Sequence, residues 1–323
     1  MKYRSWAEID LKRLTENIHK IQKFLKPGTK YLQVVKADAY GHGAIEVSRT
    51  ALNNNAYYLG VANADEGIQL RLAEIYSPVL VLSPSTSDEI EYLLNYNITP
   101  SVSSFEFAKV LDESAKKQNK KVNIHIEVDS GMGRTGITID SAEKEILRIA
   151  GLKNILIEGI FSHFPSSEIP EDPFAHIQVN KFKQLLLHLK EKKLTIPLIH
   201  FANSGGILNY PRSHFNMVRA GLLTFGEYPG GELKKIISVK PVMSFKTQVV
   251  LLKKFKKGDT ISYNRSYKLK NDSLIAVLPI GYGDGYDFLL SNKGTVLIKG
   301  NEYPIVGRVT MDLTMIDIGK NNS

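Results

Sequence analysis

The chain contains no cysteine among its 323 residues. This absence excludes disulfide bonds and thiolate metal sites, and it agrees with a reducing compartment. No apolar run approaches the ~20 residues that a membrane-spanning helix needs. The first twenty residues are too charged for the apolar segment of a secretory signal. The charged residues among these first twenty are Lys2, Arg4, Glu8, Asp10, Lys12, Arg13 and Glu16. We therefore expect a cytoplasmic protein that does not span the membrane and has no metal site.

Positive charge is in excess, with a formal net charge of +9. The lysines stand in separated clusters, at 116–117, 120–121, 190–193, 253–254 and 256–257. No DNA-binding or RNA-binding motif accompanies them, so the sequence predicts solvated faces and no nucleic-acid partner. The excess can instead attract anionic substrates and cofactors.

Short apolar runs alternate with amphipathic helical segments from residue 31 to about 226. This alternation predicts strands followed by helices. Eight such units predict an α/β fold, a closed (β/α)8 barrel of the TIM type, with functional residues at the C-terminal ends of the strands. The eight runs are 31–37, 58–62, 78–82, 98–102, 122–128, 155–162, 198–202 and 215–219.

The helical period stops after about residue 230, and alternating strands follow at 244–251, 274–278 and 295–298. Strands without helices predict a second, mostly β domain. The first amphipathic helix precedes the first good barrel strand, so the opening residues are expected to pair with the β domain. The predicted organisation is an N-terminal strand at 1–8, a barrel at 9–230 and a β domain at 231–323.

Residues 34–43 (VVKADAYGHG) are the most informative segment. Lys36 ends a run that predicts a buried strand, although lysine is seldom buried. A lysine held there can form a covalent imine through its side-chain amine. The segment is similar to the pyridoxal-attachment signature of alanine racemases. The resemblance implies that Lys36 binds pyridoxal 5'-phosphate covalently and that Tyr40 lies near the phosphate.

The resemblance to alanine racemases continues to the last stretch of the chain. Residues 129–136 match the family loop whose arginine, here Arg134, reaches the substrate carboxylate. His163 matches a histidine that lies between a catalytic phenol and a second arginine, here Arg219. The second arginine faces the pyridine nitrogen, which should stay unprotonated because a guanidinium keeps its protons. A weaker electron sink and little transamination are then expected.

The start of a short helix at 203–206 is the expected phosphate site. Backbone amides at a helix N-terminus, with the Ser204 hydroxyl, can bind phosphate, and Asn203 opens that helix. Gly221 and Leu222 are expected to add a backbone contact.

The predicted β domain also has family counterparts. They imply that Tyr263 is a second base, delivered across a head-to-tail homodimer to the opposite face of the substrate from Lys36. One group then removes the α-proton and the other returns one from the far side, so L-alanine and D-alanine interconvert. Tyr282, Met311 and Asp312 are implied to line the partner's entrance and carboxylate pocket.

Several positions depart from the family pattern. Position 127 often holds a carbamylated lysine, whereas Glu127 brings its own carboxylate to support the arginine, so no carbon dioxide adduct is needed. Asn264 replaces the usual glycine after the catalytic tyrosine, and Leu313 replaces the usual glutamine. Relatives continue beyond Gly319 through further strands, so we expect a C-terminally short β domain.

The resemblance implies an alanine racemase that supplies D-alanine for peptidoglycan. A racemase of broader specificity is an alternative, because one methylene or hydroxyl changes binding by only about 1 to 3 kcal/mol. A non-catalytic pyridoxal-phosphate homeostasis protein would have the barrel but no counterpart of Tyr263. A basic amino-acid decarboxylase of related fold would use a cysteine, and this chain has none. The hypothesis of a polyanion-binding protein has only the positive charge in its favour.

Overall fold

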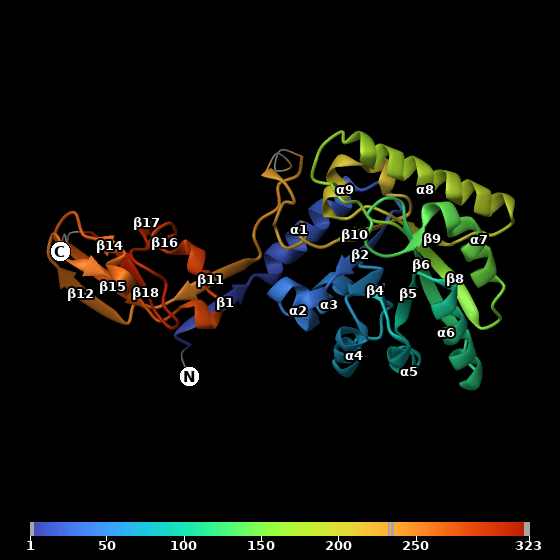
Figure 1. Cartoon of the computed structure of the whole chain (residues 1–323), viewed down its shortest axis with the longest axis horizontal. Helices are drawn as coiled ribbons and strands as arrows, with labels where there is room; N and C mark the ends of the chain where they lie inside the picture. The colour runs from blue at the N-terminus through green and yellow to red at the C-terminus, as the bar shows by residue number, and fades with distance from the viewer. Residues whose placement is uncertain (1–2, 232, 234–235, 320–323) are drawn as a thin grey trace. The chain divides into compact units, whose positions relative to one another are not determined.

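The computed structural model describes residues 3–231, 233 and 236–319. Two compact units divide the chain. One runs from Asp10 to Val242, and the other combines Met1–Ile9 with Met243–Ser323. Figure 1 labels most of their helices and strands.

The larger unit contains a closed parallel barrel. Its strands follow the order β5-β4-β3-β2-β10-β9-β8-β6, and pairing of β5 with β6 closes the ring. The predicted (β/α)8 fold is therefore confirmed, with each of the eight apolar runs supplying one strand. The strands are β2 (Lys30–Val34), β3 (Tyr58–Val61), β4 (Val79–Pro84), β5 (Thr99–Val102), β6 (Val122–Asp129), β8 (Ile155–Phe161), β9 (Leu198–His200) and β10 (Met217–Ala220), with the short β7 (Ile137–Thr138) paired to β6.

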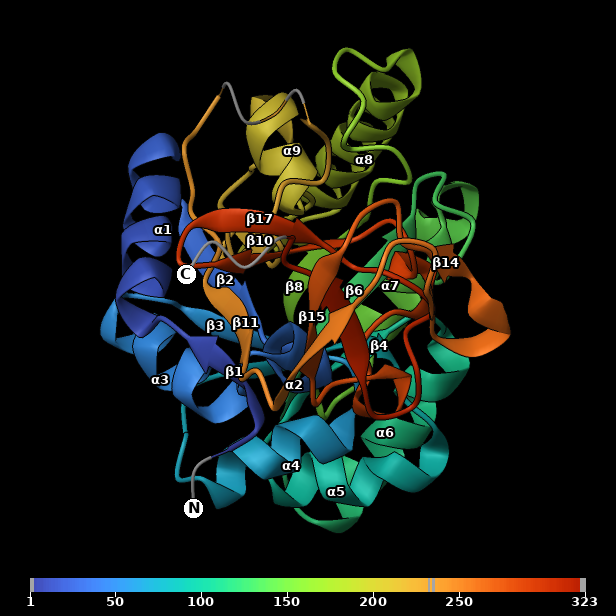
Figure 2. The ribbon, with the colours of Figure 1, turned by 90° about the vertical axis from the view of Figure 1, so that its left-hand side faces the viewer.

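Helices surround these strands, as Figure 2 shows for α1, α3, α4, α5 and α6. Local sequence sets where they begin, because Asp10, Asn63 and Ser104 each accept a backbone N–H of the first turn. None of the described helices combines the length and apolar composition needed to cross a bilayer. The barrel helices are α1 (Leu11–Phe24), α2 (Lys36–Gly41), α3 (Ala44–Asn53), α4 (Ala64–Leu72), α5 (Ile90–Asn95), α6 (Phe105–Lys117), α7 (Ile139–Ala150), α8 (Pro173–Glu191) and α9 (Ser204–Asn209), with 3-10 turns at Ser87–Glu89 and Pro211–Ser213.

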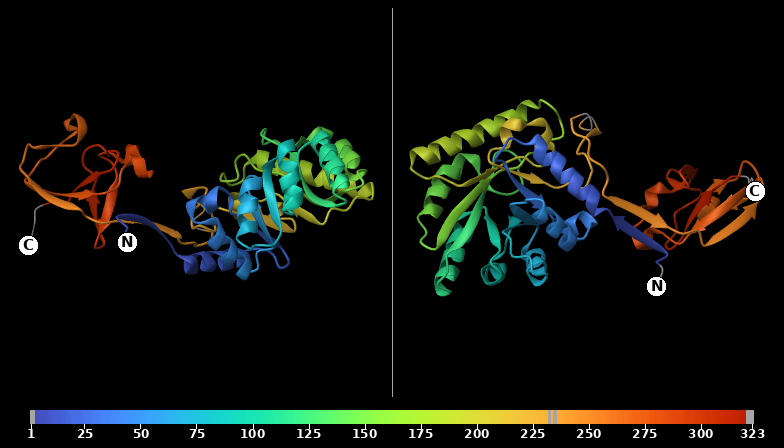
Figure 3. Two further views of the ribbon diagram at one scale, coloured as in Figure 1. Left: turned by 90° about the horizontal axis from the view of Figure 1, so that it is seen from below. Right: turned by 180° about the vertical axis from the view of Figure 1, so that it is seen from behind.

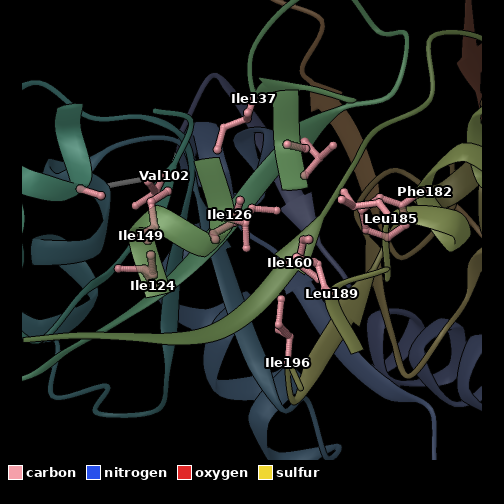
Figure 4. Close-up of a cluster of buried hydrophobic side chains, with 14 of the residues drawn as sticks. Val102, Ile124, Ile126, Ile137, Ile149, Ile160, Phe182, Leu185, Leu189 and Ile196 are labelled. Atoms are coloured by element: carbon pink, nitrogen blue, oxygen red, sulfur yellow. The ribbon is translucent and has the colours of Figure 1, made fainter. Parts of the chain in front are cut away.

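A large core cluster lies between the strands and the helices that cover them (Figure 4). Ile124 and Ile126 of β6 and Ile160 of β8 are fully buried, and Phe182 of α8 packs in the same cluster. β-branched residues suit a strand buried on both faces, which explains why the barrel runs read as continuous apolar segments. This packing holds the barrel strands in place, and the candidate site lies at their C-terminal ends.

The smaller unit is built from short antiparallel strands. β1 (Ser5–Ile9) pairs with β11 (Met243–Thr247), and the two lie side by side in Figure 3. A three-stranded sheet has the order β12-β15-β18, and its buried Ile275 and Ile316 contribute to the core of this unit. The remaining elements are β12 (Leu251–Phe255), β13 (Thr260–Ile261), β14 (Tyr267–Lys268), β15 (Ser273–Leu278), β16 (Thr295–Ile298), β17 (Asn301–Pro304) and β18 (Thr314–Asp317), with 3-10 turns at Tyr263–Arg265, Tyr282–Asp284 and Phe288–Leu290.

The prediction of a single strand at 244–251 is wrong, because the structure has two strands there. β11 ends at Thr247 and β12 begins at Leu251, because the two segments pair with different neighbours, β1 and β15. The backbone changes partner between them, with Gln248 N donating to Arg4 O and Val250 N donating to Val277 O. An alternating pattern indicates extended backbone but carries no information on the partner.

Candidate active site

Strand β2 leads into a left-handed turn that carries the lysine. The four residues 37–40 have φ between 51° and 57°, inside the segment labelled α2. A left-handed helical conformation costs roughly 1–2 kcal/mol per non-glycine residue. The turn directs Lys36 and Tyr40 into the same cavity. The predicted strand 31–37 therefore ends earlier, at Val34.

Hydrogen bonds from outside the turn hold it in place. Glu66 accepts from Ala37 N at 2.8 Å with one carboxylate oxygen and from Ala62 N at 2.7 Å with the other. Asp38 accepts from Ala44 N at 2.7 Å, which joins the turn to the start of α3. Charged acceptors form stronger hydrogen bonds than neutral ones, so these contacts can offset part of the backbone strain.

A cavity of about 520 Å³ lies at the C-terminal ends of the barrel strands. Its volume falls in the usual range for small-molecule sites. The structure brings all nine barrel residues proposed for cofactor or carboxylate binding to its wall: Lys36, Tyr40, Arg134, His163, Asn203, Ser204, Arg219, Gly221 and Leu222.

Polar groups converge at one end of this cavity. The Ser204 hydroxyl accepts from Gly221 N and Leu223 N, both at 3.2 Å, so its own proton is free to be donated. A β-carbon added at Gly221 would lie 3.0 Å from the Tyr40 hydroxyl, so glycine leaves the space beside that phenol open. Burial raises the pKa of Tyr40, which keeps its hydroxyl a donor. These donors can bind the oxygens of a phosphate.

The Lys36 amine lies among positive charges. Burial and the Arg134 guanidinium lower its pKa, Glu66 opposes this, and Arg219 adds to the lowering. A larger fraction of neutral amine follows, and the neutral amine is the form that attacks an aldehyde or accepts a proton.

Arg219 is 4% exposed and is held by four acceptors. Its Nη2 donates to Ser162 O at 2.8 Å, to Phe201 O at 3.0 Å and to His163 Nδ1 at 3.0 Å. Its Nη1 donates to His200 Nδ1 at 3.0 Å. A guanidinium has no acceptor, so both histidines accept at Nδ1 and carry their proton at Nε2. Burial lowers the pKa of Arg219 to about 10, and the group remains charged at neutral pH.

Two histidines of this network were not predicted from the sequence. His200 ends β9, and its Nε2 lies 2.8 Å from Nδ1 of His125 on β6. Both are fully buried. The sequence did contain a signal for them, because each of these two histidines is a polar residue within an apolar run that predicts a buried strand.

These buried histidines predict acid sensitivity of folding. Burial lowers the pKa of His125 and pushes that of His200 well below its ordinary value. Below about pH 6.5 the unfolded chain protonates them while the folded barrel does not, so the unfolded state binds more protons and stability falls as the pH falls. The free energy of unfolding, measured with denaturant, should therefore be lower at pH 5.5 than at pH 7, by at most about 1 kcal/mol for each buried imidazole.

A matched comparison isolates the buried imidazoles in that measurement. His125→Leu should reduce the loss between the two pH values but not remove it, because burial also lowers the pKa of His200, His163 and His214. His19→Leu, at an exposed position on α1, serves as the control. An equal pH dependence in all three proteins would contradict the prediction.

Glu127 anchors the loop that carries Arg134. The carboxylate is 2% exposed and accepts from the Thr135 hydroxyl at 2.7 Å and from the Ser103 hydroxyl at 3.1 Å. Burial raises its pKa, opposed by these two hydroxyls and then by Arg134 and Arg219. Glu127 therefore fixes the loop through Thr135, the residue next to Arg134.

Tyr263 lies in the smaller unit, on a 3-10 turn, and is 68% exposed. The next residue, Asn264, has a φ of 56°. Asparagine tolerates the left-handed region better than other non-glycine residues, which explains how it can stand where glycine is usual. The substitution is thus compatible with the turn that presents the phenol.

The other candidates of the smaller unit gather on adjoining loops. Tyr282 N donates to Thr310 O at 3.0 Å, and Gly283 N donates to Met311 O at 2.9 Å. Tyr282 is 51% exposed and Met311 57%, and Asp312 is also exposed. These loops form a second group of candidate residues, separate from the nine that line the barrel cavity.

Comparisons with known proteins cover the whole length of the chain. The model "Alanine racemase, N-terminal domain" matches residues 9–229, and "Alanine racemase, C-terminal domain" matches 242–323. Alanine racemase 1 of Clostridium acetobutylicum is 40% identical over 315 residues, 97% of this chain and 81% of the relative. The solved alanine racemase of Clostridium difficile 630 is similar with a TM-score of 0.95 and 35% identity, over 100% of this chain and 85% of that one. A structure from Bartonella henselae, titled as alanine racemase with covalently bound pyridoxal phosphate, has a TM-score of 0.88 and 28% identity, over 100% and 88% of the two chains.

Proposed function

Because this chain belongs to the alanine racemase family, we propose that it interconverts L-alanine and D-alanine in the barrel cavity, with Lys36 and Tyr263 as its two bases. Pyridoxal phosphate is the cofactor of the family, and the chain is an amino-acid racemase by the same relationship. The observation that carries the proposal is the gathering of Lys36, Tyr40, Ser204 and Arg219 around one cavity.

The residues present fit this cofactor. Lys36 would hold its aldehyde carbon, the hydroxyls of Tyr40 and Ser204 would hold its phosphate, and Arg219 would meet its ring nitrogen. The Gly221 amide, expected to contact the phosphate, instead donates to the Ser204 hydroxyl and so holds that hydroxyl in place. Asn203, whose side chain accepts from Gly206 N at 2.9 Å, keeps the helix after it in position, and Leu222 completes the cavity wall. When bound, pyridoxal phosphate withdraws electrons from the α-carbon of an amino acid.

Two bases explain a change of configuration. Lys36 Nζ takes or returns the α-proton on one face of the substrate, and its lowered pKa provides a neutral amine for this task. Oη of Tyr263 of the partner subunit takes or returns it on the other face. Arg134, on the loop held by Glu127, binds the substrate carboxylate.

His163 supports the phenol as a base. Its Nδ1 accepts from Arg219, so its Nε2 carries the proton and can only donate. A donor facing the phenol oxygen stabilises negative charge on it, which suits a phenol that acts as a base.

The shared active site requires a homodimer. Tyr263, Tyr282 and Met311 are large side chains left mainly exposed on the smaller unit. Exposed apolar groups that cluster on one surface are typical of interaction sites. Tyr282, Met311 and Asp312 would then line the entrance and carboxylate pocket of the partner.

Mixing two inactive variants tests this model. We expect Lys36→Ala and Tyr263→Ala each to lack racemase activity and their mixture, after subunit exchange, to recover about a quarter of the wild-type activity, since half of the dimers are mixed and each of those has one intact site. Optical rotation of alanine gives the readout, and native mass spectrometry confirms exchange. A mixture of Lys36→Ala with Lys36→Met should stay inactive. Mixed dimers without activity would overturn the shared site.

Activity should be independent of carbon dioxide, because Glu127 supplies a carboxylate without modification. Wild-type rates in degassed and bicarbonate-supplemented buffer should agree. Glu127→Lys should lose most activity, through a buried cation near Arg134, or regain part of it with bicarbonate. Lower wild-type activity on degassing would count against this role for Glu127.

A further inference from the structure

We propose that Glu158 and His125 are positioning residues for Arg219, acting through His200 along a chain of directed contacts across the barrel interior. The inference rests on the proposed function only in its kinetic consequence. The chain itself can be observed in the protein directly.

Four strands contribute to this chain. Arg219 of β10 donates to His200 Nδ1 of β9 at 3.0 Å. His200 Nε2 lies 2.8 Å from His125 Nδ1 of β6. His125 Nε2 lies 3.8 Å from Glu158 Oε2 of β8. A buried cation thus stands at one end and a carboxylate at the other.

With a donor at one end and a carboxylate at the other, all protons in the wild-type chain point the same way. Arg219 can only donate, so His200 accepts at Nδ1 and its proton lies on Nε2. That proton faces His125 Nδ1, so His125 accepts there and carries its own proton on Nε2. This last N–H faces Glu158. Both imidazoles are therefore neutral, and all contacts point from the guanidinium toward the carboxylate.

The environment makes these contacts strong. His125 and His200 are fully buried, and Nε2 of His125 has no hydrogen-bond partner within the described part of the chain. At 3.8 Å the Glu158 charge acts on it as an electrostatic contact, too long for a hydrogen bond. Salt and solvent screen such contacts little in a low-dielectric interior, and aligned hydrogen-bond donors polarise one another.

Glu158 is itself held in position. The Tyr58 hydroxyl donates to the same Oε2 at 2.9 Å, and it lies 2.9 Å from the Thr99 hydroxyl. The side chain of Glu158 is 24% exposed. The contact with His125 lowers the pKa of Glu158, so the carboxylate is charged at neutral pH.

A neutral side chain at position 158 removes the preference for a proton on Nε2 of His125. The amide of Glu158→Gln can donate as well as accept, so it tolerates a proton on His125 Nδ1. His200 must then carry its proton on Nδ1, where it opposes the donors of Arg219. Loss of the carboxylate thus loosens the guanidinium, although neither Glu158 nor His125 lines the cavity.

Nitrogen NMR of holoenzyme labelled with 15N-histidine tests the chain. We expect the Nε2–H tautomer for His125 and His200 in the wild type, and a mixture of tautomers in Glu158→Gln. Glu158→Asp, which keeps the charge, should restore the wild-type signals. The matched control is Glu145→Gln, since Glu145 is similarly shielded, with 20% of its side chain exposed, and bonds Arg148 on the same helix. Wild-type tautomers in Glu158→Gln would overturn the proposal.

Kinetics provide the second readout. We expect Glu158→Gln to lower kcat for alanine about tenfold, as one charged contact is lost, with KM little changed. In the His125→Asn background the same change should have no further effect, because the path to Arg219 is already broken. Additive effects would contradict a chain. An inactive wild type would refute the proposed function while the tautomers still decide this inference.

Discussion

Replacing Lys36 with arginine is expected to abolish covalent attachment of the cofactor and to lower kcat for alanine racemisation by about a thousandfold or more. Arginine keeps the positive charge but stays protonated, so it can serve neither as the attaching amine nor as a base. Lys36 is suited to both tasks because its pKa is lowered at the cavity wall.

Borohydride reduction followed by peptide mapping checks the attachment. The label should lie on Lys36 in the wild type and be absent from Lys36→Arg. Lys30→Arg is the matched control, since Lys30 lies on β2, the strand that leads to Lys36, and stacks over Tyr57, 3.7 Å from the ring centroid. A label on another lysine would refute the assignment.

Arg219→Glu is expected to lower racemisation by about a hundredfold and to increase the transaminated product formed per racemisation event. The guanidinium can only donate to the ring nitrogen, whereas a carboxylate supports a protonated ring. A protonated ring withdraws electrons more strongly and stabilises negative charge on the substrate for longer. A proton is then returned to an atom other than the α-carbon more often, which gives the transaminated product.

The ratio of the two products provides an internal standard for that variant. Loss of correctly folded protein lowers both products together and leaves their ratio unchanged. Arg219→Lys keeps a cation and should change the ratio less than Arg219→Glu. If the ratio is equal in all three proteins, Arg219 does not act on the ring nitrogen.

The barrel could be predicted because its strands form short apolar runs, and most of the helices between them carry apolar residues at helical spacing. Ile124, Ile126 and Ile160 show the outcome, with fully buried side chains on adjacent strands. The change of partner after Thr247 could not be predicted, since pairing is decided by residues far away in the sequence.

The candidate site was predictable to a different degree. The nine cavity residues belong to motifs that resemble a known family, and they line one cavity. His125 and His200 belong to no such motif, and their importance comes from what they contact across the barrel. The role of Tyr263 depends on a second subunit, so it remains a proposal.

The left-handed turn at 37–40 also has a consequence for the order in which the chain folds. Its four residues together cost about 4 to 8 kcal/mol in an isolated peptide, so the turn cannot serve as a nucleus. One of the contacts that favour it comes from Glu66, 29 positions along the chain from Ala37. We therefore expect strand β3 and helix α4 to form before the turn does, and Lys36 to reach its final position after them.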